Sequence, residues 1–132
     1  AFIMANPAPT QNIKVSRSPL KATITLAKLN GPLCLCIPNI AKLYPEGIVY
    51  AIIGDPEDPE LKGADIAAGE WVPSSPDAEP EDGEYQQSQD LEVELSLAQL
   101  QWFKGRIVEL RYQGTGESSL TTDSDPILFI FI

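Results

Sequence analysis

The side chains of this sequence that could do chemistry are mostly carboxylates, and they gather in proline-containing loops. They form three clusters: Asp55, Glu57, Asp58 and Glu60; Asp77, Glu79, Glu81 and Asp82; and Asp123 with Asp125. Calcium prefers several carboxylate oxygens around one site. If two of these loops converge, the candidate calcium ligands are Asp55, Glu57, Asp58, Asp77 and Asp82. The spacing does not match an EF-hand loop, so solvated acidic loops are the favoured interpretation and calcium is the alternative.

Common catalytic arrangements are excluded by what the sequence lacks. The chain contains no histidine, which removes the most frequent general base, the usual serine-hydrolase arrangement and most zinc sites. With 19 acidic residues, some pair of carboxylates is always available, so a glycosidase-type pair carries little information. The glycine-containing segment at residues 114–118 lacks the lysine of a phosphate-binding loop and is typical of a hairpin turn. We therefore predict no catalytic residues and no enzymatic activity.

The two cysteines, Cys34 and Cys36, lie two residues apart in an apolar segment. In an extended strand, residues at this spacing point to the same face. A disulfide between them would strain the backbone, so we expect thiols and no disulfide. Such a pair could serve redox chemistry or supply half of a metal site, but the sequence has no other cysteine and no histidine to complete it. The favoured interpretation is two small hydrophobic residues buried in a strand that is covered on both faces.

Aromatic residues provide candidate contact surfaces for a partner. Trp71 and Tyr85 lie in polar loop sequence and are candidates for stacking against a sugar or contacting a protein, whereas Trp102 is expected to pack in the core. The final segment, residues 127–132, has no polar face. Either the acidic middle of the chain folds over its second face, which is the favoured interpretation, or Phe129 and Phe131 meet another protein or a second copy of the chain.

Size and charge limit the classes of protein to which this chain can belong. A chain of 132 residues corresponds to one domain and can bury a hydrophobic core without a metal or disulfides. The net charge is −10, and residues 51–96 carry fourteen acids against one lysine. This acidity disfavours nucleic acid and anionic membranes as partners. No apolar run reaches about 18 residues, so no membrane span is predicted. No signal peptide is visible at the start, and the compartment stays open.

Short hydrophobic segments separated by turn residues predict an all-β fold. The expected strands are either alternating or uniformly apolar, and they lie at residues 19–26, 33–37, 48–53, 91–95, 106–113 and 127–132. One short helix is expected before residue 106, because Ser96 and Gln99 have the spacing of a capping box and Gly105 fits the left-handed position that ends a helix. No helix is long enough to connect parallel strands, so the expected architecture is an antiparallel β-sandwich.

Proline positions and composition divide the chain into regions. Residues 1–12 are polar and interrupted by prolines, which predicts a flexible lead-in with at most a short edge strand. Residues 13–132 make up the single predicted domain. Within it, residues 73–90 are acidic and proline-containing. We expect a loop insert there with little regular structure, preceded by a short strand around Trp71.

Two segments resemble bacterial immunoglobulin-like modules of the kind found in surface or exported proteins of Pseudomonas-type bacteria. In residues 95–112 (LSLAQLQWFKGRIVELRY), a strand leads into a short helical turn, a glycine and a strand that ends in an aromatic residue. A hairpin and a final strand that begins after Pro126 follow. In residues 34–50, a strand ends near Pro38, and a linker with Gly47 precedes a hydrophobic strand. The resemblance covers residues 20–132, and the acidic insert and the two cysteines depart from it.

The resemblance implies an immunoglobulin-like antiparallel β-sandwich with one short helix between late strands. It also implies a structural or adhesive role and a location outside the cell or on its surface, and it supplies no catalytic residues. Together with the residues above, it leads us to predict a non-catalytic structural or protein-interaction module. The alternative is an adhesion module that binds calcium or carbohydrate through the acidic loops and Trp71. No cofactor other than that calcium is expected.

Overall fold

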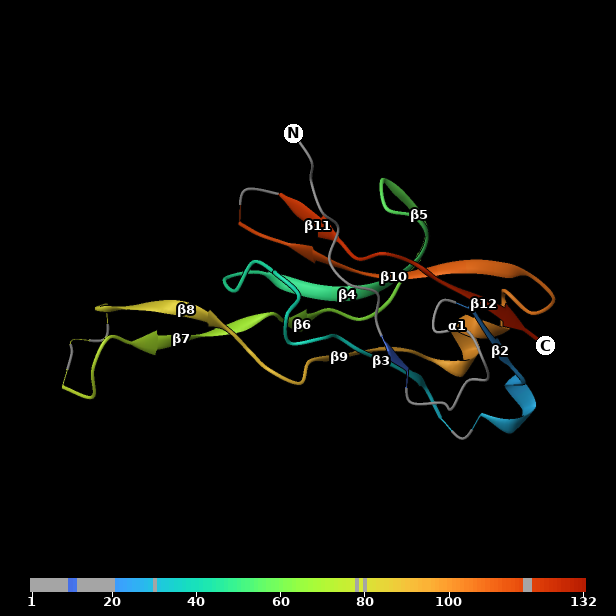
Figure 1. Cartoon of the computed structure of the whole chain (residues 1–132), viewed down its shortest axis with the longest axis horizontal. Coiled ribbons are helices and arrows are strands. Elements are labelled where there is room, and N and C mark those ends of the chain that lie inside the picture. The colour runs from blue at the N-terminus through green and yellow to red at the C-terminus, as the bar shows by residue number, and fades with distance from the viewer. Residues whose placement is uncertain (1–9, 12–20, 30, 78, 80, 118–119) are drawn as a thin grey trace.

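The chain folds mainly into β-strands, as a computed structural model shows (Figure 1). The structure describes residues 10–11, 21–29, 31–77, 79, 81–117 and 120–132. Strands account for 51% of it and helices for 8%, which confirms the all-β prediction. Of the predicted lead-in at residues 1–12, Thr10 and Gln11 form a strand, and the rest lies outside the described residues.

The described strands are short and follow one another closely along the chain. In order they are β1 (Thr10–Gln11), β2 (Lys21–Ile24), β3 (Leu33–Cys36), β4 (Ile48–Asp55), β5 (Asp58–Lys62), β6 (Ile66–Ala67), β7 (Gly69–Pro73), β8 (Gly83–Gln87), β9 (Glu92–Leu95), β10 (Ile107–Thr115), β11 (Thr121–Asp123) and β12 (Ile127–Phe131). The helical segments are a short 3-10 helix, η1 (Leu26–Lys28), and α1 (Leu97–Gln101). Within the described residues, neither of them has the length and apolar character needed to cross a membrane.

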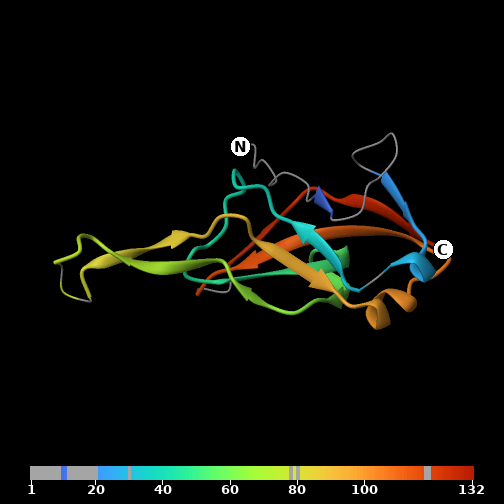
Figure 2. The same ribbon diagram turned by 90° about the horizontal axis from the view of Figure 1, so that it is seen from below.

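Two sheets make up the body of the molecule. The larger sheet has the strand order β2–β12–β10–β4–β5, with β11 added beside β10 and β6 beside β4. Its pairings are antiparallel except that of β12 with β2, which is parallel. The smaller sheet has the antiparallel order β1–β3–β9. Figure 2, turned by 90° from Figure 1, shows the strands of both sheets gathered at one end of the molecule, beside α1 and η1.

One hydrophobic core lies between these sheets. Each sheet turns alternate side chains inward, so the core draws on both: Leu33, Leu35, Val93 and Leu95 from the smaller sheet, and Val49, Ala51, Ile53, Val108, Leu110, Tyr112, Ile127, Phe129 and Phe131 from the larger one. The inward face of β10 is the one that its sequence predicts. Burial of each large apolar side chain contributes about 1.5–3 kcal/mol, so this layer is the main source of stability.

The last strand, β12, is covered within the body, which corrects a prediction made from its sequence. Phe129 and Phe131 are 0% exposed, and their stacked ring centroids lie 5.8 Å apart inside the core. The prediction of a partner interface at these two rings is therefore wrong. The physical reason is that both rings lie on the face of β12 that contributes to the core between the two sheets. The acidic segment does not supply the cover either, because it projects away from β12 (Figure 1).

Helix α1 begins after Ser96, as its sequence predicts, but it ends at Gln101, before the predicted terminating residue Gly105. The Ser96 hydroxyl oxygen accepts a hydrogen bond from the Gln99 backbone N–H at 3.1 Å, and the Gln99 side-chain oxygen accepts one from the Ser96 N–H at 2.9 Å. This reciprocal capping box satisfies two backbone donors at the start of the helix. After the helix, Gly105 adopts a φ of +84°, a left-handed conformation that glycine tolerates without a steric penalty.

Trp102 lies outside the core, contrary to the prediction. Leu100 and Phe103 are buried, but Trp102 is 83% exposed. A residue two positions after Leu100 lies about 200° further around a helix, on the opposite side. The helix is too short for its sequence to show an apolar stripe, so the inward and outward positions could not be assigned from periodicity.

We predict that two aromatic truncations lower the free energy of unfolding by very different amounts. Phe129→Ala should lower the free energy of unfolding by about 3–5 kcal/mol, because it opens a cavity in the core. Trp102→Ala should change it by less than about 0.5 kcal/mol, because that ring is exposed. Urea unfolding followed by circular dichroism measures both, with Phe129→Leu as a milder variant if the alanine variant does not fold. Equal effects of the two truncations would contradict the described burial.

Candidate functional site

Strands β7 and β8 form a separate two-stranded ribbon that projects from one end of the long axis of the molecule (Figures 1 and 2). The pairing is antiparallel and places Trp71 opposite Tyr85. The predicted loop insert at residues 73–90 therefore contains a strand, which is a correction to the sequence analysis. Gly83 permits the close pairing, because an added Cβ would lie 2.3 Å from the carbonyl oxygen of Val72.

The two faces of the ribbon differ in chemistry. Side chains alternate between faces along each strand, so Trp71 and Pro73 share one face with their partners Tyr85 and Gly83. This face, which we call the aromatic face, carries no charge. The opposite face carries Glu70 and Glu84, together with Val72 and Gln86. The ribbon therefore presents an uncharged aromatic face on one side and the carboxylates of Glu70 and Glu84 on the other.

The aromatic face is held by a contact between its two rings. The centroids of Trp71 and Tyr85 are 5.3 Å apart, and the ring planes meet at 78°. This edge-to-face arrangement contributes about 0.5–1.5 kcal/mol beyond the area buried. Trp71 is 43% exposed and Tyr85 is 44% exposed. Both residues were predicted as surface candidates from their polar surroundings, and the structure brings them together on one face.

The ribbon carries negative charge and no lysine or arginine of its own. Between residues 69 and 87, all six acidic side chains are exposed: Glu70, Asp77, Glu79, Glu81, Asp82 and Glu84. The sequence contains no lysine or arginine from residue 63 to residue 103. Residues 69–87 therefore carry six negative charges and no positive one, and the ribbon favours cationic surfaces as partners.

The base of the ribbon is fastened to the body by the side chain of Gln87. Its Nε2 donates to the carbonyl oxygen of Ala41 at 2.7 Å, and its Oε1 accepts from the backbone N–H of Leu43 at 2.8 Å. A backbone hydrogen bond of 3.0 Å from Ser88 N–H to the carbonyl oxygen of Ala68 closes the ribbon at the same end. The position of the aromatic face relative to the core thus depends on a single amide side chain and a few backbone contacts.

The candidate calcium ligands fall into two separate places. Asp55, Glu57 and Asp58 lie in or next to the β4–β5 turn, whereas Asp77 and Asp82 lie at the far end of the ribbon (Figure 1). At the turn, the Asp55 carboxylate already accepts a hydrogen bond from the Glu57 backbone N–H at 2.9 Å. Among the described residues, no three acidic or cysteine side chains are grouped so that they could hold a metal ion. The structure does not bring the two loops together.

The cysteines lie on the outer face of β3, and not in the core as predicted. Leu33 and Leu35 point inward and are buried, so Cys34 and Cys36 point outward and are half-buried. No disulfide joins them, as expected. Opposite them on β9, carboxylate oxygens of Glu94 and Glu92 lie 3.7 Å from Cys34 Sγ and Cys36 Sγ respectively. Burial raises the pKa of the Cys34 thiol, and the charge of Glu94 raises it further.

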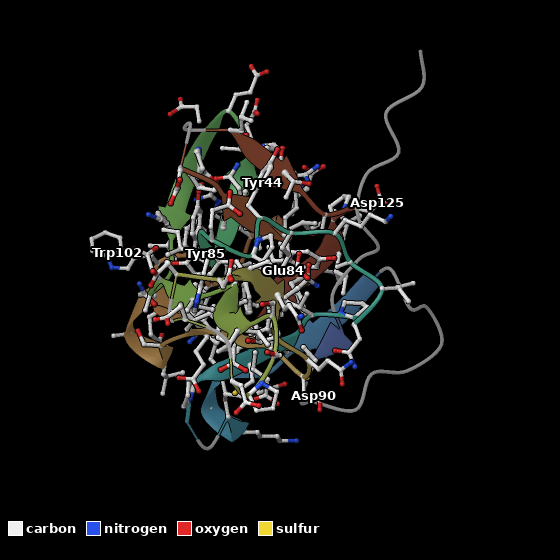
Figure 3. The ribbon with its side chains drawn as sticks, turned by 90° about the vertical axis from the view of Figure 1, so that its left-hand side faces the viewer. Tyr44, Glu84, Tyr85, Asp90, Trp102 and Asp125 are labelled. Atoms are coloured by element: carbon white, nitrogen blue, oxygen red, sulfur yellow. The ribbon has the colours of Figure 1, made fainter. Side chains whose placement is uncertain are left out.

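A second exposed apolar surface lies at the other end of the molecule, and sequence analysis missed it. Trp102 and Phe103 line a shallow hollow of about 340 Å³ together with Leu61, Glu60 and Arg106. Figure 3, which looks along the long axis from the ribbon end, shows Trp102 projecting from the side of the molecule. Because Trp102 was assigned to the core, only its exposure in the folded chain identifies this surface.

Comparisons with protein-family models, with curated proteins and with solved structures found no match to this chain. The resemblance to bacterial immunoglobulin-like modules therefore stays a prediction from the sequence. Function has to be argued from the two exposed surfaces, and the ribbon is the stronger candidate. It combines exposed aromatic residues, a distinct projecting shape and a single sign of charge.

We predict that Gln87 controls the stability of the ribbon more than that of the body. Gln87→Ala should speed amide hydrogen exchange in β7 and β8 by roughly tenfold, because it removes two hydrogen bonds worth about 0.5–1.5 kcal/mol each. Exchange in β10 should change much less. Gln86→Ala is the matched control, since this neighbouring side chain is exposed on the opposite face. Equal protection of the ribbon in both variants, measured by NMR, would rule out the anchoring role.

We also predict slow thiol chemistry at Cys34. In a Cys36→Ser background, alkylation by iodoacetamide at neutral pH should be slower than that of a free cysteine, because a raised pKa leaves less thiolate. Glu94→Gln should shift the midpoint of the pH–rate profile downward, since it removes a negative charge next to the thiol. Glu92→Gln, the control, should shift it less. A midpoint at or below that of a free cysteine would contradict the described environment.

Proposed function

We propose that the chain is an immunoglobulin-like module that acts by binding another protein through the aromatic face of its β7–β8 ribbon, without catalysis. The observation that carries this proposal is the pair Trp71 and Tyr85, which lie together and exposed on a projecting ribbon. Tryptophan and tyrosine are the residues most often found at the energetic centre of protein interfaces. They offer large contact areas with little conformational entropy to lose.

The strand order supports the immunoglobulin-like part of the proposal. Immunoglobulin-like domains place strands A, B and E in one sheet and C, F and G in the other, and C′ joins the second sheet in the variable type. Here the smaller sheet is β1–β3–β9 and the larger is β12–β10–β4–β5 with β2 beside β12. These orders match A–B–E and G–F–C–C′. The ribbon lies in the chain between the positions of C′ and E, where strand D would otherwise pair with E.

The shape of the ribbon supports a binding role rather than a purely structural one. An isolated two-stranded ribbon is only marginally stable in water, because it cannot bury its side chains. In this chain the ribbon forms a sheet of its own and leaves both aromatic rings more than two-fifths exposed. A contact that covers the aromatic face would bury apolar area and stabilise the ribbon at the same time.

The geometry of the rings favours protein over carbohydrate. A sugar ring that stacks on two aromatic residues needs their faces roughly parallel, whereas Trp71 and Tyr85 meet at 78°. The angle between the rings suits a side chain that enters from one side, and the carboxylates at the far end of the ribbon suit a cationic one. The alternative of a calcium- or carbohydrate-binding adhesion module has no comparable feature in its support.

We predict that a photo-crosslinking amino acid at position 85 captures a specific protein partner in the native cells. The side chain there lies on the aromatic face, so an adduct should form with whatever covers that face. The matched control is the same amino acid at position 109, since Glu109 is exposed on β10 of the body. Adducts are identified by mass spectrometry. A set of adducts that is the same at both positions, or no adduct at position 85, would overturn the proposed function.

A further inference from the structure

The chain has two exposed aromatic surfaces, and they lie at opposite ends of its long axis. The β7–β8 ribbon occupies one end, and α1 and η1 occupy the other (Figures 1 and 2). We call the second surface the α1-end patch and define it by Lys28, Trp102, Lys104, Arg106 and Ile107. Trp102 is 83% exposed and Ile107 is 61% exposed. Each end thus carries exposed apolar area that a contact would bury.

Several contacts place the members of the α1-end patch together. Helix α1 packs next to η1. The Leu26 backbone N–H donates to the carbonyl oxygen of Ile132 at 2.8 Å, and the Gly105 N–H donates to that of Phe131 at 2.6 Å. These two bonds bring Lys28 and Lys104, each two residues or fewer away, to the same end of β12. Trp102 directly follows α1 and, together with Arg106, lines the hollow of about 340 Å³.

The charges of the two ends are opposite. The ribbon carries six exposed carboxylates and no cation, as described above. The α1-end patch carries three cations, Lys28, Lys104 and Arg106, all exposed. Arg106 is bound by Glu60 through two hydrogen bonds of 2.9 and 3.1 Å. Neither lysine forms an ion pair with a carboxylate of the described residues. The two lysines are therefore available to an acidic partner.

We infer that the partner of the ribbon is a second copy of this chain, which receives the ribbon on its α1-end patch. The inference rests on the proposed function and gives the ribbon a specific occupant. Trp71 and Tyr85 of one copy cover the hollow beside Trp102 of the next. The carboxylates at the far end of the ribbon, Asp77 and Asp82, face Lys28 and Lys104. Apolar area is buried at the centre of the contact, and opposite charges border it, as in other protein interfaces.

The position of the two surfaces determines the kind of assembly. The contact joins two different surfaces, so each copy keeps one ribbon and one patch unoccupied in a dimer. A heterologous contact of this kind closes into a ring or continues as an open chain of copies. Because the ribbon and the patch lie at opposite ends of the long axis, the copies line up head to tail. The bordering charges are exposed, so added salt weakens the association.

Sedimentation equilibrium of the purified chain tests the inference. Between roughly 1 µM and 1 mM, where small interfaces associate, the average mass should rise above the 14.4 kDa of one copy. It should continue to rise beyond a dimer, and added salt should reduce it. A chain that stays at the mass of one copy over this whole range overturns the inference.

Two charge-reversal variants identify the surfaces. The ribbon variant carries Asp77→Lys and Asp82→Lys, and the patch variant carries Lys28→Glu and Lys104→Glu. Each alone should associate at least roughly tenfold more weakly, because like charges then meet. An equimolar mixture should associate again, since the intact ribbon of the patch variant fits the intact patch of the ribbon variant. Rescue in the mixture would not occur if the two surfaces did not meet.

The matched control is Glu92→Lys with Glu94→Lys, which gives the same net charge as the ribbon variant but changes the outer face of β9. It should associate like the unmodified chain. Thermal unfolding of every variant confirms that it is folded, which is expected because all six substituted positions are exposed. Association that survives both charge reversals overturns the inference. If position 85 captures a different protein while the chain stays monomeric, the inference fails and the proposed function stands.

Discussion

The fold depends on strand β10, which is paired along both edges. Its outer face carries a buried polar cluster. It pairs with β4 over six residue positions and with β12 over four. On its outer face, Gln113 is buried, and its Nε2 donates to the Pro56 carbonyl oxygen at 3.0 Å and to the Asp123 carboxylate at 2.6 Å. The Tyr50 hydroxyl donates to its Oε1. One side chain thus ties the β4–β5 turn and β11 to the sheet, and loss of such a buried partner costs about 1–3 kcal/mol.

This arrangement separates the stability of the body from that of the ribbon. The core side chains all lie between the two sheets or under α1, and none of them belongs to β7 or β8. The ribbon instead depends on its own backbone pairing, on the contact between Trp71 and Tyr85 and on the Gln87 anchor. Segments with few buried contacts open at lower free energy than the core around them. Side chains on the ribbon can therefore change its binding without changing the fold.

The sequence correctly predicted strands whose two faces differ in polarity. It was less informative for strands whose two faces are alike. In β10, Val108, Leu110 and Tyr112 alternate with more polar residues. This alternation indicates the face that the folded chain turns into the core. Strand β8 is exposed on both faces, so it shows no alternation and was taken for a loop. Strand β12 is covered on its core face and half-covered on the other, so an apolar sequence could not show which neighbours cover it. Convergence of the two acidic loops depends on strand pairings between distant segments, and so does the direction in which Trp102 points.

The concentration of carboxylates on the ribbon has opposite consequences for the isolated chain and for a contact. Within one copy, six like charges on the two strands and the segment that connects them repel one another, and no lysine or arginine of the ribbon offsets this. The repulsion lowers the stability of an element that already has little core of its own. A bound cationic surface offsets the repulsion among the ribbon carboxylates and also attracts them. Charge therefore favours association through two separate effects. Screening by salt reduces both terms, which stabilises the isolated ribbon while it weakens the contact. The same residues therefore link the order of the ribbon to the presence of its partner.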